Sequence, residues 1–336
     1  MTMKKITGIF LALLLLLSAS ACVKNEEEIT TQPTVPETAP HTHALTTEII
    51  ASGDNDGISW AIYADGRLEI EGNGECDVSW GLYANVIKKV IFGEGITSIG
   101  AGSFENCKIL TELVLPQSMQ IIESRAFAGC AVRKLEVGVN LHTLAGDAFI
   151  GCELDNIRIA SANPYLSTDQ YGVIFNKDKT RLILYSNGFR MNTYSVPSSV
   201  TVIGERAFEG NMYLATLQLS ESLTEIETNA FKDCENLRKV VFPKGFYRIG
   251  VRAFSGCRAL NDVRFNEEFK IIGEYAFEGC VNLTKIRFLK GIEIIGSGAF
   301  DETLTEIYFE GSVQRWETVS KGDNPAFAAN SINFEE

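Results

Sequence analysis

Apolar residues recur along this chain at a fixed interval of 23 positions between Gly204 and Phe300. Aligned on that interval, the rows read IGERAFEGN, IETNAFKDC, IGVRAFSGC, IGEYAFEGC and IGSGAF. Their phenylalanines are Phe208, Phe231, Phe254, Phe277 and Phe300. A period of about 20 to 50 residues is typical of repeat architectures, in which each unit buries its apolar side against the next. The pattern predicts a solenoid with an internal ladder of phenylalanines.

A second apolar pattern begins about 17 residues before each phenylalanine. In one row it consists of Leu237, Val240 and Phe242. The last two lie two residues apart, which is the period of a strand with one buried face. A further apolar pair, such as Phe246 and Ile249, predicts another short strand on the opposite wall. We therefore expect a mostly β fold, an open right-handed solenoid of parallel strands with about 23 residues per coil.

The two ends of such a stack need covers, because a terminal coil has one face without a neighbour. The segment ISWAIYADGRLEIEG, from Ile58 to Gly72, predicts a hairpin that turns at Asp65-Gly66. It would belong to an N-terminal β cap over residues 48–86. The aromatic residues expected to plug the stack, or alternatively to form a carbohydrate platform, are Trp60, Trp80 and Tyr83.

Residues 304–336 depart from the row pattern and predict a C-terminal β cap. Leu304, Ile307 and Phe309 form a last strand in this prediction, and Trp316 covers the exposed end. A short closing strand is expected at Ile332 and Phe334.

The repeats, expected over residues 87–303, are interrupted once. Leu154 and Met191 lie 37 residues apart where 23 is expected. The extra residues include YGVIFNKDKTRLILYS, which reads as two strands around Asn176 to Thr180. We predict an inserted hairpin at about residues 160–190 that projects from the solenoid. It is either a functional loop, as long insertions often are, or an embellishment without a contact role.

The N-terminal segment has the layout of a secretory leader. Lys4 and Lys5 precede an apolar run too short to span a bilayer, and small residues lead into Cys22. This SASAC stretch resembles the lipobox of bacterial lipoproteins, although Ala19 stands where that family more often has Leu. The resemblance implies a signal peptide over residues 1–21 and a lipid on Cys22; the alternative is an ordinary cleavage site. Residues 22–47 are rich in Thr, Pro and Glu and predict a flexible linker.

Charge and cysteine spacing narrow the function. The net charge of −13 makes nucleic acid an unlikely partner, because phosphate contacts need clustered Lys and Arg. Most of the cysteines lie three residues after a row phenylalanine, a slot that Asn211 and Thr303 share. We expect small buried thiols there, although stacked coils would also bring neighbours within disulfide range. Cys76 lies outside this series and is a candidate for a reactive thiol, with an inert thiol as the alternative.

No catalytic constellation follows from the pattern. His142 lies within a row, and His41 and His43 lie in the linker, so no Ser-His-Asp or Cys-His pair can be placed. Zinc-ligand spacing and a phosphate-binding glycine motif are both absent from the sequence. We expect a protein that is not an enzyme and that uses neither a cofactor nor a metal.

The full row, LxxVxFPxxxxxIGxxAFxxC, resembles the BspA-like leucine-rich repeats of bacterial surface proteins. The resemblance covers roughly Ile87 to Thr303, with eight readable rows. It implies a leucine-rich repeat solenoid on a bacterial surface lipoprotein. Adhesion or host-protein binding is reported for some members, and no catalytic residues come with the resemblance.

Outward side chains of the predicted strands offer a binding surface, since alternate residues of a strand point away from the core. Four of them predict a cationic patch on an acidic chain, with like charges side by side, which would suit an acidic partner such as a carboxylate-rich protein loop or a sulfated glycan. Neutral drift beside Asp262 and Glu306 is the alternative. Tyr308 lies beside this patch. The four cations are Lys239, Arg264, Lys285 and Arg287.

We expect a monomer that is lipid-anchored at the bacterial cell envelope and exposed at its surface. Its partner would be an extracellular protein or glycan, and its membrane contact would be the N-terminal lipid alone. The alternative is a scaffold that organises another envelope protein.

Overall fold

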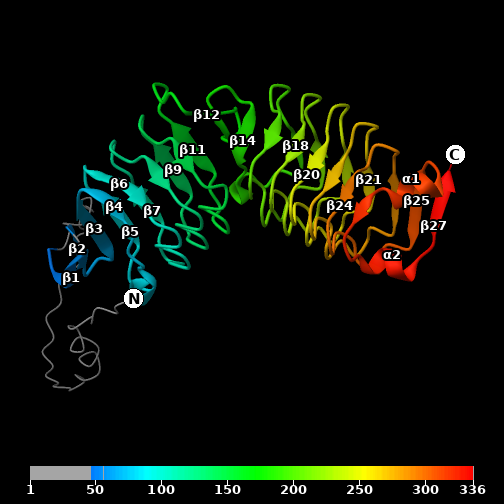
Figure 1. Cartoon of the computed structure of the whole chain (residues 1–336). Coiled ribbons are helices and arrows are strands. Elements are labelled where there is room, and N and C mark those ends of the chain that lie inside the picture. Colours follow the sequence, from blue (N-terminus) through cyan, green and yellow to red (C-terminus); the bar gives the residue numbers. More distant parts are fainter. Residues whose placement is uncertain (1–46, 56, 336) are drawn as a thin grey trace, which may run out of the picture.

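The computed structural model describes residues 47–55 and 57–335. The predicted signal peptide, Cys22 and nearly all of the linker lie outside the described residues. The described chain forms a curved, elongated stack of coils, with β1 at one end and β27 at the other (Figure 1). We call each turn of this stack a coil. The predicted fold class, a mostly β solenoid with two β caps and one inserted hairpin, is confirmed.

The N-terminal cap contains three antiparallel strands, β1 to β3, and a fourth strand, β4, that pairs in parallel with β6. The hairpin turns at Asp65-Gly66 as predicted, and Gly66 has a φ of 89° there. Strand β3 then pairs in parallel with β5, which joins the cap to the first coil. The elements are β1 (Ile49–Asn55), β2 (Ile58–Tyr63), β3 (Arg67–Gly72), β4 (Gly74–Cys76) and the 3-10 helix η1 (Gly81–Tyr83).

Two walls of parallel strands form the coils. In the first wall, central residues such as Val240 and Val263 are buried while their neighbours face outward, as the period of two predicts. The strands of this first wall are β5 (Lys89–Phe92), β7 (Glu112–Val114), β9 (Lys134–Val137), β11 (Asn156–Ile159), β15 (Thr193–Ser195), β17 (Thr216–Gln218), β19 (Lys239–Val241), β21 (Asp262–Arg264), β23 (Lys285–Phe288) and β25 (Glu306–Glu310).

The second wall consists mostly of two-residue strands, and each of them follows a first-wall strand along the chain. They are β6 (Ile96–Ile99), β8 (Ile121–Ile122), β10 (Thr143–Leu144), β16 (Val202–Ile203), β18 (Glu225–Ile226), β20 (Arg248–Ile249), β22 (Ile271–Ile272), β24 (Ile294–Ile295) and β26 (Ser320–Lys321).

The glycine that follows β20, β22 and β24 is required by close packing of these coils, although Glu227 takes the same position after β18. A Cβ on Gly273 would lie 2.5 Å from the carbonyl carbon of Gly250 in the preceding coil. Any larger residue would push these coils apart, which explains the recurring Ile-Gly pair.

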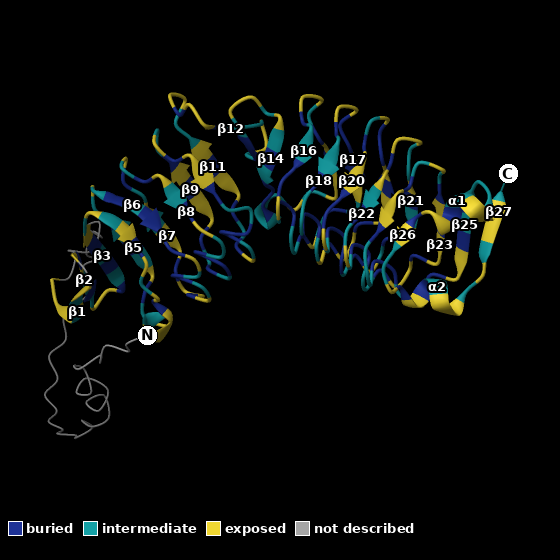
Figure 2. Ribbon diagram, viewed as in Figure 1, coloured by how far each residue is buried: buried dark blue, intermediate teal, exposed yellow. Residues whose placement is uncertain are grey.

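The phenylalanine ladder runs through the interior, as predicted. Phe254 is fully buried and stacks between Phe231 and Phe277, with ring centroids 5.1 and 5.3 Å away and planes within 3° of parallel. The interior side of each coil is buried along the whole stack (Figure 2). Offset stacking of aromatic rings adds to the free energy gained by burying their area.

The insertion does not project from the solenoid, and that part of the prediction is wrong. Its strands are β12 (Leu166–Thr168), β13 (Ile174–Asn176) and β14 (Arg181–Leu184), followed by the 3-10 helix η2 (Asn187–Phe189). The turn between β13 and β14 falls between Asn176 and Arg181, where it was predicted. However, β14 pairs in parallel with β16 and so belongs to the second wall. The apolar residues Val173 to Phe175 are fully buried, which holds the hairpin inside the stack.

The hairpin separates two hydrophobic cores. One cluster of buried residues runs from Ile58 to Leu184, and the other runs from Val173 to Ala326. Ile174 and Leu184 belong to the first cluster, whereas Phe175 and Leu182 belong to the second. The two faces of β13 and β14 therefore pack against different cores.

The C-terminal cap contains the predicted closing strand, β27 (Ile332–Glu335), which pairs in parallel with β25. Two short helices that the sequence pattern did not predict, α1 (Val313–Glu317) and α2 (Pro325–Ala329), lie beside it. Trp316 is buried, with its ring centroid 5.1 Å from that of Phe309 and 5.7 Å from that of Phe288. It covers the last coil as expected.

Candidate functional site

The outward strip is the surface formed by the outward side chains of β19, β21, β23 and β25. Residues between the buried positions of these strands face outward because side chains alternate along a strand. The five residues predicted for binding all lie on it: Lys239, Arg264, Lys285, Arg287 and Tyr308.

The four cations of the strip do not form an uncompensated patch, which corrects the expectation of like charges side by side. The in-register pairing places Lys239 opposite Asp262, with Nζ 3.2 Å from Oδ2. Lys285 lies opposite Glu306 in the same way, at 3.4 Å. The first outward positions of successive strands therefore form a column in which positive and negative side chains alternate from one coil to the next.

The two arginines of the neighbouring column are also paired, one with Asp262 again and one with a carboxylate of the C-terminal cap. Arg264 donates from Nε to Oδ1 of Asp262, two residues earlier, at 2.9 Å. Arg287 reaches Glu335 of β27, with NH2 2.8 Å from Oε2. The repeat pattern carries no signal for Glu335, because this residue lies in the cap, beyond the repeats that set the register.

The titration of these groups reflects the pairing. The pKa of the Asp262 carboxyl is lowered overall. Partial burial alone would raise this pKa, but the hydrogen bonds from Arg264 and Lys239 lower it by more. The hydrogen bond to Asp262 raises the pKa of Arg264, and that to Glu306 raises the pKa of Lys285. The strip is therefore a mixed-charge surface at neutral pH.

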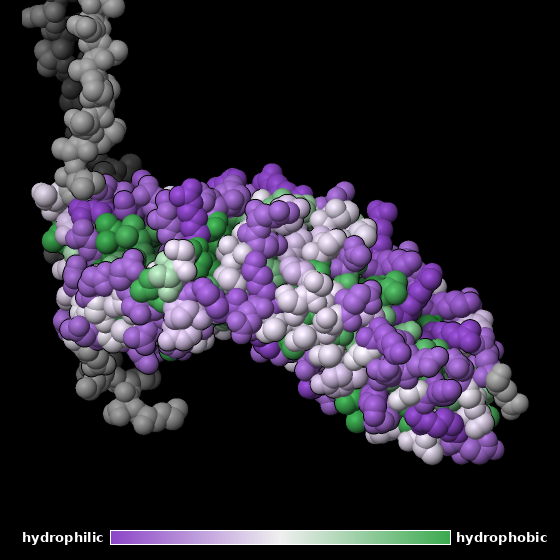
Figure 3. Space-filling view, turned by 90° about the horizontal axis from the view of Figure 1, so that it is seen from above, coloured by the Kyte–Doolittle hydropathy of each residue, from purple (hydrophilic) through white to green (hydrophobic). Residues whose placement is uncertain are grey.

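Tyr308 adds an aromatic group to the strip. The Lys285 ammonium lies 4.5 Å from its ring centroid, a cation–π arrangement. Nearby, Val241 is 48% exposed on the same wall. Apolar and charged side chains are thus interspersed here. Seen from above, the molecule is mostly hydrophilic, with its most continuous apolar patches toward the N-terminal end (Figure 3).

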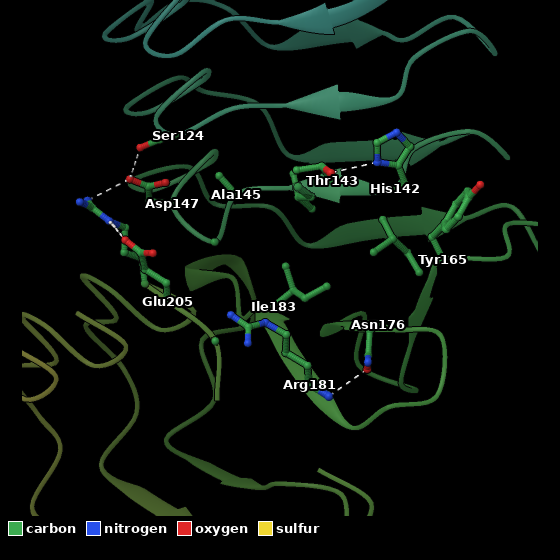
Figure 4. A pocket seen from close by; sticks show the side chains of 15 residues that line it. Ser124, His142, Thr143, Ala145, Asp147, Tyr165, Asn176, Arg181, Ile183 and Glu205 are labelled. Atoms are coloured by element: carbon green, nitrogen blue, oxygen red, sulfur yellow. Dashed lines mark hydrogen bonds and ion pairs between the residues drawn. The ribbon is translucent and has the colours of Figure 1, made fainter. Parts of the chain in front are cut away.

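A second candidate is the insertion cleft, which lies where the second wall is broken. The sheet that ends at β10 and the sheet that contains β14 are not hydrogen-bonded to each other. The space between them has a volume of about 470 Å³. Figure 4 shows His142 and Tyr165 at one end of the cleft, Asp147 and Glu205 at the other, and Arg181 with Ile183 across from β10.

Asp147 is the most buried polar group of the cleft, at 1% exposed. Its Oδ2 accepts hydrogen bonds from the Ser124 hydroxyl at 2.8 Å and from NH1 of Arg206 at 3.0 Å. Its Oδ1 has no hydrogen-bond partner among the described residues. A buried carboxylate oxygen without a donor is uncommon in native structures.

The other end of the cleft is aromatic. The His142 and Tyr165 rings meet edge to face with centroids 5.5 Å apart. Nδ1 of His142 lies 2.9 Å from the Thr143 hydroxyl oxygen. Tyr165 is 49% exposed, so part of its side chain is available to a ligand.

Two other candidates from the sequence are structural. Trp80 is buried and stacks on Phe104 at 5.8 Å, and Trp60 packs edge-on against it at 5.3 Å. These rings plug the first coil, as expected, and the buried Trp80 is unavailable as a carbohydrate platform. Cys76 is buried, and burial raises its thiol pKa to about 11, so the inert alternative holds.

The ladder cysteines are free thiols, as are all seven cysteines of the described residues. The Cys257 thiol donates to the carbonyl oxygen of Phe231 in the preceding coil at 3.1 Å. The same contact recurs at Cys130, Cys152, Cys234 and Cys280. The slot thus connects adjacent coils by a weak hydrogen bond, without a covalent bridge.

Residues 47–55 and 57–335 contain neither a cluster of potential metal ligands nor a helix that could span a membrane. Among these residues, no group of three or more His, Cys, Asp or Glu side chains is placed to hold a metal ion. None of the helices in this part of the chain is long and apolar enough to span a membrane.

Stacked parallel strands, a repeat of about 23 residues and an aromatic ladder define a leucine-rich repeat solenoid. The model of the BspA type leucine-rich repeat region matches in 6 copies, over residues 82–172 and 183–306. These segments cover more than half of the chain, which belongs to this family. Its members are in general non-enzymatic repeat proteins of bacterial surface type. No curated protein matches the sequence significantly.

Solved structures share the fold at low sequence identity. A leucine-rich repeat protein from Eubacterium ventriosum superposes with a TM-score of 0.62 at 19% identity, covering 84% of this chain and 95% of that one. A leucine-rich cell surface protein from Faecalibacterium prausnitzii gives 0.56 at 19% identity, covering 82% and 99%. The pneumococcal vaccine antigen PcpA gives 0.52 at 16% identity, covering 86% and 100%. At these identities the likeness concerns the fold alone.

Proposed function

We propose that this protein is a non-enzymatic lipoprotein of the bacterial cell surface that binds an extracellular partner through its outward strip. The observation that carries the proposal is the strip itself, a row of paired charges with interspersed apolar side chains that no other part of the described chain covers. Parallel sheets normally have both faces covered, so an uncovered sheet face is available to a partner.

The chemistry of the strip favours a protein over a polyanion as the partner. A sulfated glycan would have to compete with Asp262, Glu306 and Glu335 for the same cations. A protein surface with both signs of charge can instead exchange ion pairs with the strip and cover Val241 and Tyr308. Such complementarity sets specificity and association rate more than raw affinity. A neutral glycan remains the second class of partner within this function.

The cell-surface location rests on the N-terminal sequence. We propose that residues 1–21 are removed, that Cys22 carries the lipid, and that residues 22–47 connect it to a monomeric solenoid. The family's surface type supports this location. Labelling of growing cells with a fatty-acid analogue tests it: Cys22→Ala should abolish incorporation of the label, and unchanged labelling would refute the anchor.

Binding is tested by pull-down with the full chain against extracellular proteins and against the envelope of the producing cell. The variant carries Lys239→Gln, Arg264→Gln, Lys285→Gln and Arg287→Gln. The matched control carries Lys134→Gln and Arg158→Gln on β9 and β11 of the same wall. Because charged contacts at an interface typically contribute about 1 kcal/mol or more when covered, we expect at least a tenfold loss for the variant and little change for the control.

Two results would contradict the proposal. Equal capture by the variant and the parent chain would exclude the strip. Capture of an envelope protein of the same cell, with no extracellular partner, would assign the strip to a scaffold.

A further inference from the structure

The insertion cleft lies at the break in the second wall, whereas the outward strip lies on the first wall. The cleft exists because β12 pairs with β13 rather than with β10, so the coil after β10 leaves the second wall. The carbonyl oxygens of His142 and Leu144 consequently have no hydrogen-bond partner among the described residues. In the preceding coil, the equivalent carbonyls of Gln120 and Ile122 accept from the next coil.

The cleft therefore has an excess of acceptors. It offers these two backbone carbonyls and the exposed carboxylate of Glu205, whereas the unpartnered Oδ1 of Asp147 is buried beneath the surface of the cleft. Its cations are already committed: both terminal nitrogens of Arg181 bind Glu227, and Arg206 binds Asp147, Glu205 and Glu209. An anionic ligand would find no free cation, whereas a ligand with several hydroxyl donors would satisfy these oxygens.

The shape of the cleft favours a compact ligand over an extended peptide. A Cβ on Gly146 would lie 2.3 Å from the carbonyl oxygen of Glu205. The backbone just after β10 therefore contacts the backbone just after β16 directly. A peptide added to the edge of β10 would have to continue through that contact. A volume of about 470 Å³ lies in the range of pockets that hold small organic ligands.

The aromatic end of the cleft suits one more property of such a ligand. The half-exposed Tyr165 ring, held edge-on by His142, presents an apolar face beside polar groups. A saccharide has C–H groups on one face of its ring and hydroxyls around its edge, so it can stack on Tyr165 and donate toward the acceptors.

We propose that the insertion cleft is a binding site for a neutral saccharide. Tyr165 and His142 hold the ring face, and the carbonyls of His142 and Leu144, together with the Glu205 carboxylate at the far end, accept its hydroxyls. The proposal does not depend on the outward strip, since the two surfaces share no residues.

The test is isothermal titration of the purified full chain with lactose, maltose, cellobiose and chitobiose. We expect binding of at least one of them in the millimolar range or tighter, weakened about tenfold or more by Tyr165→Ala and by His142→Ala, since each removes a stacking or edge contact. Both side chains are exposed, so these variants should keep their folding. The matched control is Tyr247→Ala, an exposed residue that takes the position of His142 in a later coil and should bind normally.

Three results would overturn the proposal. The first is that none of the four sugars binds at any concentration up to its solubility limit. Another is sugar binding that survives both Tyr165→Ala and His142→Ala. The third is selection of extended peptides, but no sugar, by the same cleft in a display experiment with the two variants as controls. Loss of the outward-strip partner would not affect any of these readouts.

Discussion

At the scale of single residues, the buried cysteines stabilise the folded chain only while their thiols are neutral. Burial is the largest effect on each, and it raises the pKa of Cys107 to about 11 and that of Cys152 to about 12. For Cys257, burial raises the pKa well above its ordinary value, and the neighbouring Cys234 raises it further. In the unfolded chain the same groups ionise near their usual pKa of about 8.5.

This difference predicts that the protein loses stability in mild alkali. A thiol whose pKa is higher in the folded state contributes fully below the pKa of the unfolded state, and its contribution declines as pH rises toward the folded value. We expect the urea midpoint to fall steadily from about pH 8 to about pH 10. Cys107→Ala should lower the midpoint at pH 7 but give a shallower pH dependence. A pH-independent midpoint across this range would contradict the prediction.

The ladder phenylalanines supply much of the packing within each coil. Phe254 contacts the rings of the coils before and after it and is fully buried. Truncation to alanine therefore removes apolar burial and leaves a cavity between two rigid coils. We expect Phe254→Ala to reduce the free energy of unfolding by about 3–5 kcal/mol, measured by urea denaturation.

Val251→Ala is the matched control for this change, because Val251 lies three residues away and is 38% exposed. It should cost about 0.5 kcal/mol or less. A Phe254→Ala protein of parental stability would mean that the ladder does not pack as described.

At the scale of elements, the regular coils could be predicted and the irregular one could not. A period of 23 residues fixes which positions of β19 or β21 are buried, because every coil repeats the same environment. For the insertion, the sequence predicted two strands and their turn. It could not predict that β14 would pair with β16. Ile174 and Phe175 are buried on opposite faces of the hairpin, and in the sequence such a strand is simply a continuous apolar run without alternation.

The same reason limits prediction of the sites. The register placed Lys239, Arg264, Lys285 and Arg287 on one surface correctly, but their ion partners include Glu335 from beyond the repeats. The insertion cleft combines residues of coils separated by the hairpin, such as Asp147 and Arg206. These residues are far apart in the sequence and become neighbours only because the second wall is broken. A 23-residue period does not predict where that break occurs.

At the scale of the whole molecule, the inserted hairpin acts as a partition between two cores. Stability in a solenoid is approximately a sum of coil terms and nearest-neighbour terms, so a weak junction divides the stack into separate cooperative units. Here the junction lacks the strand pairing between β10 and the next coil of the second wall. We therefore expect the N-terminal and C-terminal coils to unfold as two units.

Substitutions on the two faces of the hairpin make this expectation specific. Ile174→Ala removes packing from the core on the N-terminal side, and Phe175→Ala removes it from the core on the C-terminal side. Hydrogen exchange followed by mass spectrometry in low urea should show faster exchange in β5 to β10 for the first variant. The second should accelerate exchange in β16 to β22 instead. If both variants accelerate exchange equally throughout, the solenoid is one cooperative unit, and the hairpin joins the two cores rather than separating them.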